Sequence, residues 1–192
     1  MRYTIFIFFL LFHFTSYTQV TGFGTGIFLA KEFSKEIALY KAKYFLFNNI
    51  IGTSAEVTQF EVIPLAAASS GELTTLLYKC ESKNIEGLIL GFYGNYWNNS
   101  GVLYQGFAFK NLPKNKAYEF LNKIENSINS NNRFLGDNND NNNIVFRFED
   151  IDVLIWNTTG SYVIRLFWNG FDSTWDQTAY VRSKRRFEKK IK

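Results

Sequence analysis

Carboxylates are the side chains whose type and spacing could support catalysis in this sequence of 192 residues. Two carboxyl groups placed on either side of a glycosidic bond can act as general acid and general base or nucleophile. Three candidates are expected at a hairpin turn and two at a helix start, where acids are also ordinary solvated or capping residues. The five candidates are Glu149, Asp150, Asp152, Asp172 and Asp176. The sequence therefore leaves open a carboxylate-dependent, glycan-directed hydrolase.

Most other catalytic chemistry is excluded by what the sequence lacks. The only histidine is His13, and the only cysteine is Cys80. Because His13 lies in a predicted leader, the mature chain has no Ser-His-Asp or Cys-His nucleophile and no histidine-ligated zinc. It contains neither a Ser-x-x-Lys motif nor a P-loop. We expect no cofactor and no metal site, and we expect Cys80 to be a buried, inert thiol.

Loop aromatics are the candidates for ligand binding. Tyr93, Tyr96 and Trp97 lie in a hairpin rich in Gly and Asn, and Trp168 and Trp175 flank a second Gly-containing stretch. Exposed aromatic rings between such residues can bind a glycan or a protein partner. Core packing is the competing explanation, above all for Trp175.

The C-terminal tail, residues 182–192, is strongly basic. It carries seven Lys or Arg residues against one acid, Glu188, which gives a net charge of +6. Such a run predicts an anionic surface as partner, namely lipid, lipopolysaccharide or acidic glycan in an exported protein, and not nucleic acid. The alternative is a solvated helix end that complements its own dipole. The residues predicted to face the anionic surface are Arg182, Lys184, Arg185, Arg186, Lys189 and Lys190.

The first nineteen residues read as a secretory signal peptide. Arg2 is followed by a ten-residue apolar run, Ile5 to Phe14, and then by a short polar stretch that ends near Gln19. This order is typical of a signal peptide, and the run is about half the ~20 residues that span a membrane as a helix. We therefore expect export to the periplasm or the medium. Residues 20–192 then form a single domain with no transmembrane segment.

The Asn-rich segment 129–143 includes a superficial likeness to a calcium loop. Counted from Asp137, the sixth and twelfth positions hold Asn142 and Phe148, where an EF-hand has Gly and Glu. The likeness fails, and a solvated loop is the favoured interpretation.

The elements that must position these residues follow from hydrophobic periodicity. A helix is predicted over Phe33–Ile51, and a second follows Pro113 with Asn115 as its N-cap. A third begins at Asp172 or Ser173. Strands are predicted at Phe60–Ala66, Leu73–Cys80, Leu88–Tyr93, Val102–Lys110, Ile144–Phe148, Asp152–Trp156 and Tyr162–Trp168.

Short links between these strands predict an α+β fold with a mainly antiparallel sheet. We expect about six or seven strands, with two or three helices on one face of the sheet. The resulting hypothesis is an exported, non-catalytic binding or interaction domain whose partner is a glycan or an envelope protein. The alternatives are the hydrolase above and a subunit of an envelope assembly.

Overall fold

The computed structural model describes residues 38–97, 103–136 and 140–191, and the side chains of all but residues 38, 96, 97 and 103–105 among them. The predicted signal peptide, residues 1–19, lies outside the described residues. The strands of the described part are β1 (Glu61–Ala67), β2 (Leu73–Cys80), β3 (Ile85–Trp97), β4 (Leu103–Pro113), β5 (Asn143–Phe148), β6 (Ile151–Thr158), β7 (Ser161–Trp168) and β8 (Phe171–Asp176). The helices are α3 (Ala38–Leu46) with a π-helical turn (Phe47–Ile51), α4 (Lys114–Ser130), the short α5 (Asn132–Leu135) and α6 (Gln177–Lys190), and a 3-10 turn spans Glu81–Lys83. The expected α+β class is confirmed.

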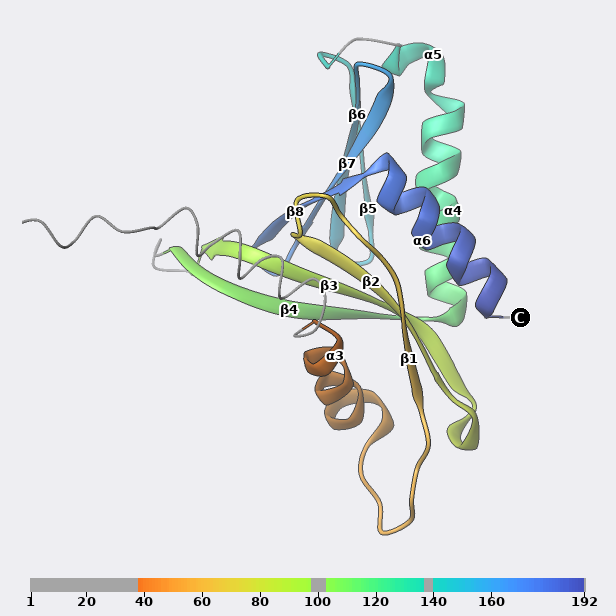
Figure 1. Cartoon of the computed structure of the whole chain (residues 1–192). Coiled ribbons are helices and arrows are strands. Elements are labelled where there is room, and N and C mark those ends of the chain that lie inside the picture. Colours follow the sequence, from red (N-terminus) through yellow and green to blue (C-terminus); the bar gives the residue numbers. More distant parts are fainter. Residues whose placement is uncertain (1–37, 98–102, 137–139, 192) are drawn as a thin grey trace, which may run out of the picture.

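The strands form two four-stranded antiparallel half-sheets that meet at one point (Figure 1). The N-terminal half-sheet is the meander β1–β4, and the C-terminal half-sheet is the meander β5–β8. Strand β8 pairs with β3 only at Phe171 and Tyr96, beyond the point where Leu73 of β2 pairs with Phe92. The C-terminal half-sheet thus joins β3 where β2 has ended.

Helices α4 and α6 cover a core that both half-sheets share. Phe120 of α4 packs on Phe148 and stacks on Trp175, with ring centroids 5.2 and 6.4 Å away. Tyr180 of α6 packs edge-on against Trp175 at 5.1 Å, and its hydroxyl donates to the Leu121 carbonyl at 2.7 Å. The two helices therefore hold the two half-sheets together despite the single bridge between them.

Helix α3 packs on the opposite face of the N-terminal half-sheet, which contradicts the expectation that all helices share one face. Leu46 of α3 belongs to a second buried cluster with Leu76, Tyr78 and Ile89 of β2 and β3. The physical reason is that these two strands are apolar on both faces, so each face needs a cover. The cluster also contains Cys80, which is buried as expected.

The predicted start of the last helix was wrong, because residues 171–176 form strand β8. Phe171, Ser173 and Trp175 alternate inward, and the polar Ser173 hid this two-residue period in the sequence. Asn169 and Gly170 both have positive φ, 50° and 79°, as a tight two-residue hairpin turn requires. Helix α6 begins only at Gln177.

The N-cap of α4 also differs from the prediction. Pro113 is the N-cap residue, and Asn115 lies inside the first turn of the helix. No side chain caps this end. Proline suits a helix start because it has no N–H that would need a partner there.

Candidate functional site

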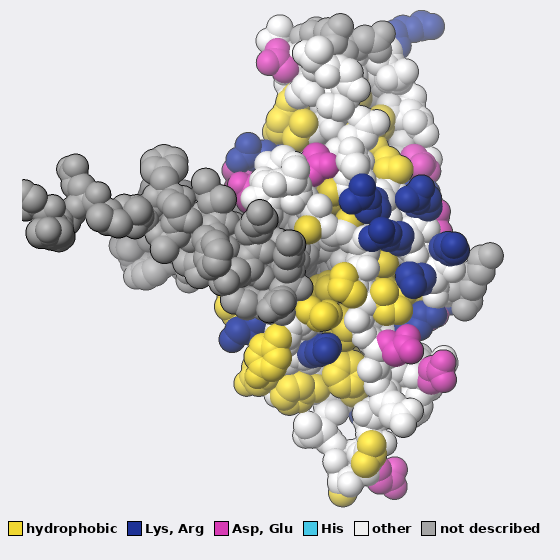
Figure 2. Space-filling view, viewed as in Figure 1, with side chains coloured by type: hydrophobic (Ala, Val, Ile, Leu, Met, Phe, Trp, Pro, Cys, Tyr) yellow, Lys and Arg dark blue, Asp and Glu magenta, His cyan; other side chains and the backbone are white. Residues whose placement is uncertain are grey.

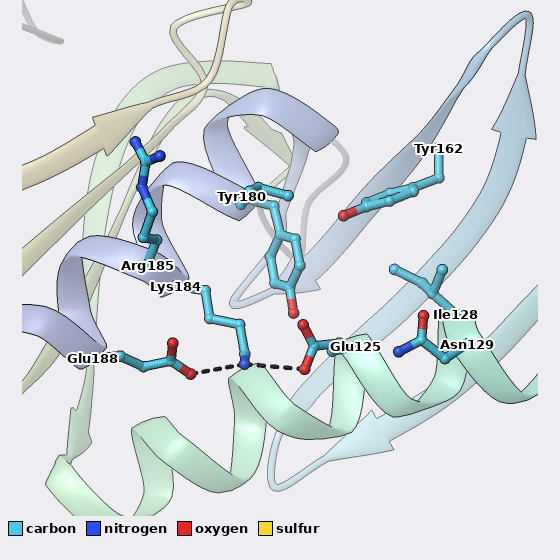
Figure 3. A pocket seen from close by; sticks show the side chains of 9 residues that line it. Glu125, Ile128, Asn129, Tyr162, Tyr180, Lys184, Arg185 and Glu188 are labelled. Atoms are coloured by element: carbon cyan, nitrogen blue, oxygen red, sulfur yellow. Dashed lines mark ion pairs between the residues drawn. The ribbon is translucent and has the colours of Figure 1, made fainter.

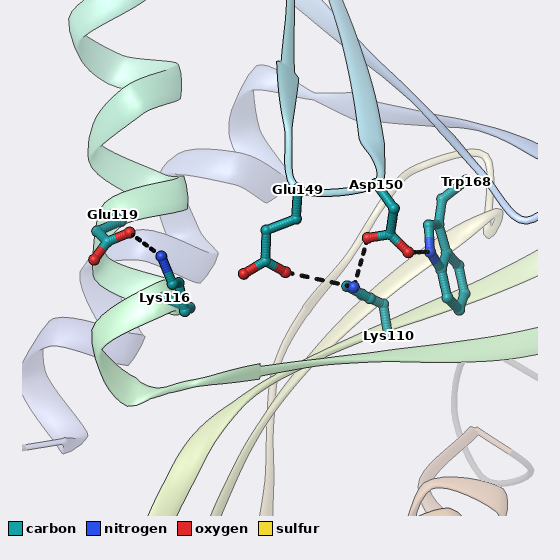
Figure 4. A network of polar contacts seen from close by, with 6 residues as sticks. All are labelled: Lys110, Lys116, Glu119, Glu149, Asp150 and Trp168. Atoms are coloured by element: carbon teal, nitrogen blue, oxygen red, sulfur yellow. Dashed lines mark hydrogen bonds and ion pairs between the residues drawn. The ribbon is translucent and has the colours of Figure 1, made fainter.

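Three of the predicted site residues converge on Lys110 at the edge of the core (Figure 4). Lys110 of β4 contacts Asp150 at 2.5 Å and Glu149 at 3.5 Å, both from the β5–β6 turn. The indole Nε1 of Trp168, on β7, donates to the second oxygen of Asp150 at 2.8 Å. The cluster therefore joins β4 of one half-sheet to β5–β7 of the other.

The electrostatics of this cluster favour a charged Asp150 carboxylate. Burial alone would raise the pKa of the Asp150 carboxyl, but hydrogen bonds from Lys110 and Trp168 outweigh it and lower that pKa. The Lys110 ammonium lies between the Asp150 and Glu149 carboxylates, where a hydrolase would need room for the scissile bond. A glycosidase also needs one carboxyl held protonated, and the contacts of Asp150 oppose that. The cluster is best described as an ion pair on the surface, since the Asp150 side chain is 59% exposed.

The other two candidates beside a hairpin turn pair with arginines across neighbouring strands. Asp152 accepts from Arg147 at 2.6 and 2.7 Å, and this guanidinium lowers the pKa of the Asp152 carboxyl. Asp172 accepts from Arg165, with a distance of 2.7 Å for the longer of its two contacts. Asp172 is therefore a paired strand residue and not part of a helix start.

Asp176 is the N-cap of α6. Its carboxylate accepts from the Ala179 amide at 2.9 Å and from the Ser69 amide, in the β1–β2 turn, at 2.8 Å. Burial alone would raise the pKa of this carboxyl, but the two backbone N–H groups outweigh it and lower that pKa. The residue fastens α6 to the N-terminal half-sheet.

The predicted aromatic residues lie near the junction of the half-sheets but on different faces, with Trp168 against the core under α4 and α6 and Tyr93 against the cluster under α3. Trp168 packs on Phe92 at 5.1 Å and is half-buried. Tyr96 pairs through its backbone with Phe171, while the side chains of Tyr96 and Trp97 lie outside the described residues. Tyr93 is half-buried, and burial raises its pKa.

Trp175 is placed differently from the other predicted aromatic residues. Its side chain is 1% exposed, in the centre of the core between α4 and α6. This ring cannot stack on a ligand in the folded protein, so the structure corrects its assignment to the binding surface. Trp168 and Tyr93 are the predicted aromatic residues whose described rings are only half-buried.

The basic tail is an ordered helix, and it displays five cations on one side. Figure 2 shows Lys and Arg side chains gathered along α6. Their spacing of i, i+3, i+4, i+7 and i+8 places them on one side of the helix. We call this set the basic face; it consists of the exposed residues Arg182, Arg185, Arg186, Lys189 and Lys190.

The buried side of α6 fixes the basic face in place. Ala179, Tyr180, Ser183 and Phe187 are buried. The Ser183 hydroxyl hydrogen-bonds to Thr75 of β2 at 2.6 Å. Arg186 also donates to the Leu65 carbonyl of β1. The cations are thus carried by a helix that is fastened to the core along its length.

Lys184 does not belong to the basic face, contrary to the prediction. Its ammonium bridges Glu125 of α4 at 3.0 Å and Glu188 at 2.7 Å, and its side chain is 14% exposed. Burial alone would lower the pKa of Lys184, but the two carboxylates outweigh it and raise that pKa. This lysine joins α6 to α4, and its charge is neutralised by the two carboxylates within the protein.

A pocket of about 210 Å³ lies beside the basic face, between α4, β7 and α6 (Figure 3). Glu125 and Glu188 lie on either side of Lys184 along one wall, and Tyr162 of β7 points toward them. Burial and the nearby Glu125 carboxylate raise the pKa of Tyr162 to about 12, so the phenol keeps its proton. Arg185 lines the pocket and also belongs to the basic face.

Sequence reasoning missed the residues that lie far apart along the chain. From the sequence, Lys110 is only the last residue of a predicted strand, 40 residues before Asp150. No motif links Glu125 or Tyr162 to α6. The helical spacing of the tail cations was the one signal that could have separated Lys184 from the basic face.

Within the described residues, no group of three or more His, Cys, Asp or Glu side chains is arranged to hold a metal ion. Of the candidate calcium loop, residues 137–139 lie outside the described residues. None of the described helices is long and apolar enough to cross a membrane.

Comparison of the chain with protein-family models, with curated proteins and with solved structures gave no match.

Proposed function

We propose that this chain is an exported, non-catalytic binding domain that docks on an anionic surface through the basic face of α6. The observation that carries the proposal is the spacing of the five exposed cations on a helix whose other side is buried. Because α6 is already folded, the basic face loses less backbone conformational freedom on binding than a frayed tail would, and this favours affinity. The only acid of the tail, Glu188, is turned to Lys184 and does not screen the basic face.

The test is the binding of a generic polyanion, dextran sulfate, to the mature chain at low salt. A triple variant, Arg182→Gln, Arg185→Gln and Lys189→Gln, should lose about a hundredfold in affinity, because each cation contributes about 1 kcal/mol near an anionic surface. The salt dependence of binding should fall with it.

The matched control removes three other cations, with Lys41→Gln, Lys43→Gln and Arg133→Gln. These residues lie on α3 and α5, so the net charge changes equally while α6 is intact. The control should keep wild-type affinity. Equal losses in the two triple variants would mean that net charge and not the basic face determines binding, and the proposal would fail.

Export has a separate test. N-terminal sequencing of the protein from the periplasmic or secreted fraction should begin near Gln19 or Val20. An intact Met1 in that fraction would contradict the signal peptide.

The hydrolase alternative is supported only by the proximity of Glu149, Asp150 and Trp168. Incubation with soluble glycans, followed by a reducing-end assay, should show no turnover. Turnover that Asp150→Asn abolishes would replace the proposal by this alternative.

The third hypothesis, an envelope assembly subunit, would be favoured if the protein co-fractionates with an envelope complex after the basic face has been neutralised.

A further inference from the structure

The pocket beside the basic face has the size of a single ring-shaped organic group. Its volume is about 210 Å³, which equals the share of roughly seven water molecules at ~30 Å³ each. Drug-sized ligands occupy pockets of ~300–1,000 Å³, so this one suits a smaller unit. Val181 lines the pocket and is 47% exposed, and Arg185, which also lines the pocket, belongs to the basic face. A ligand in the pocket would therefore extend directly onto the cations.

The polar wall of the pocket suits hydroxyl groups. Glu125 and Glu188 offer carboxylate acceptors, and Lys184 between them offers ammonium donors. A hydroxyl both donates and accepts, so a polyhydroxylated ring can use all three groups. An acyl chain in the same place would remove these charged groups from water and offer them no hydrogen bond, which costs free energy. An anionic group deep in the pocket would face two carboxylates, while Arg185 lies at the pocket wall and the other cations of the basic face lie beyond it on α6.

The remaining wall is apolar and held firmly. The Tyr162 ring packs on Tyr180 with centroids 6.2 Å apart, and the Tyr162 amide donates to the Gln177 side chain at 3.1 Å. Ile128 and Val181 complete this side. One apolar wall with an aromatic ring, opposite one wall of donors and acceptors, matches a sugar ring, whose C–H face is apolar and whose edge is polar.

We propose that the pocket binds one sugar unit of an acidic polysaccharide, and that carboxylate, phosphate or sulfate groups of the same polymer lie on the basic face. The proposal rests on the proposed function, since it names the class of anionic partner that α6 contacts. From Arg182 to Lys190 the face extends about 12 Å along the helix axis at 1.5 Å per residue. The pocket adds to the basic face a site that recognises hydroxyl groups. A lipid bilayer would contact the basic face and leave the pocket empty.

The experiment compares ligands of equal charge with and without sugars. Oligogalacturonate and chondroitin sulfate oligosaccharides are compared with polyglutamate of matched charge and with phosphatidylglycerol vesicles, by isothermal titration calorimetry or vesicle sedimentation. The wild-type protein should bind at least one of the two glycans about tenfold more tightly than polyglutamate. Equal affinity for polyglutamate and both glycans, or tighter binding to the vesicles, would overturn the proposal.

Two variants test the pocket itself. Val181→Trp fills the pocket mouth from an exposed position and should remove the tenfold preference, while polyglutamate affinity is unchanged. Val145→Trp, at a position 73% exposed on β5, is the matched control and should bind as wild type. A Val181→Trp protein that keeps the glycan preference would contradict the pocket site.

Glu125→Gln gives a signature that charge alone cannot produce. It removes a negative charge beside the basic face, so polyglutamate affinity should stay the same or rise, while the loss of an acceptor should lower glycan affinity about threefold to tenfold. A rise for both ligands would overturn the pocket proposal and leave docking by the basic face intact. If the triple variant of the basic face still binds polyglutamate like wild type, the proposed function fails instead.

Discussion

The two half-sheets are built from similar strands but are buried in different ways. The N-terminal half-sheet lies between α3 on one face and α4 with α6 on the other, and nearly every residue of β2 is buried. The described elements cover the C-terminal half-sheet on one face only, so residues of β6 alternate between buried and half-exposed. Its open face holds two cross-strand pairs, Arg147–Asp152 and Arg165–Asp172.

This difference shows where the chain can hold polar chemistry. A strand covered on both faces has no position at which a charge keeps its water, and burial of an unpaired charge is costly. Polar groups are found where no described helix covers the sheet. Examples are the ion pairs of the C-terminal half-sheet, the Lys110 cluster and the pocket beside α6. The interior of the N-terminal half-sheet provides stability, the Lys110 cluster and the pocket lie at the margins of the C-terminal half-sheet, and the basic face lies on α6 beside β1 and β2.

The largest expected effect comes from the covered face of the C-terminal half-sheet. Trp175→Ala should lower the free energy of unfolding by about 3–5 kcal/mol, since the ring is buried against Phe120 and Tyr180. Val145→Ala, on the open face, should change it by no more than about 0.5 kcal/mol. Urea unfolding measures both. Similar losses would mean that the open face is covered in solution.

The next effect compares neighbouring residues within one strand of each half-sheet. Leu88 and Ile89 point to opposite faces of β3. Because both faces are covered, Leu88→Ala and Ile89→Ala should each lower the free energy of unfolding by about 2–5 kcal/mol. On β6, Leu154→Ala should cost less than Val153→Ala, although leucine loses more atoms, because Val153 is fully buried and Leu154 is not. A small effect of Ile89→Ala would show that α3 does not protect its face.

A smaller effect concerns the contact between the halves at Asp176. Asp176→Ala should cost about 0.5–2 kcal/mol at pH 7, the usual cost of losing an N-cap. Because the folded pKa is lower than the unfolded value near 3.9, this stability is present above about pH 4 and is lost as the pH falls through the folded pKa.

Unfolding of wild type and Asp176→Ala at pH 7 and pH 2.5 tests the linkage. The difference in free energy of unfolding between wild type and Asp176→Ala should be smaller at pH 2.5 than at pH 7. A difference of the same size at both pH values would assign the effect to packing and not to the charged cap. Asp176→Asn, which keeps an acceptor without the charge, is the control and should show little pH dependence.

The smallest effect is expected from the pairs on the open face. A double-mutant cycle of Arg165→Gln and Asp172→Asn should give a coupling of about 0.2–1 kcal/mol that declines with added salt. Coupling that salt leaves unchanged would indicate that this face is shielded from solvent.

The same contrast explains what the sequence could predict. Alternation located β5, β6 and β7 because one open face leaves a period of two, as in Ile144–Phe148. Alternation could not reveal that both faces of β2 and β3 are covered by helices, because a continuous apolar run does not indicate which elements pack on each face of the strand. Strand β8 was missed because Asp172 and Ser173 are also typical of helix starts.

The candidate sites follow the same logic. The cations of α6 and the surface position of Asp150 could be read from nearby residues. The meeting of Asp150 with Lys110, and of Glu125 with Tyr162 and Lys184, depends on three-dimensional packing between distant elements, for which no local pattern exists. Local sequence therefore predicts single elements of a site, while their combination comes from the fold.

The way β8 and α6 complete the N-terminal half has a consequence for biosynthesis. Ser69 bonds to Asp176 and Thr75 to Ser183, partners separated by 107 and 108 residues. A ribosome makes Asp176 and Ser183 long after Ser69 and Thr75, so the emerging chain cannot close its core before α6 has been made. Contacts of such long range also slow folding. If the chain is exported as proposed, delayed closure would keep it in the unfolded form that a secretion channel accepts until α6 has been made.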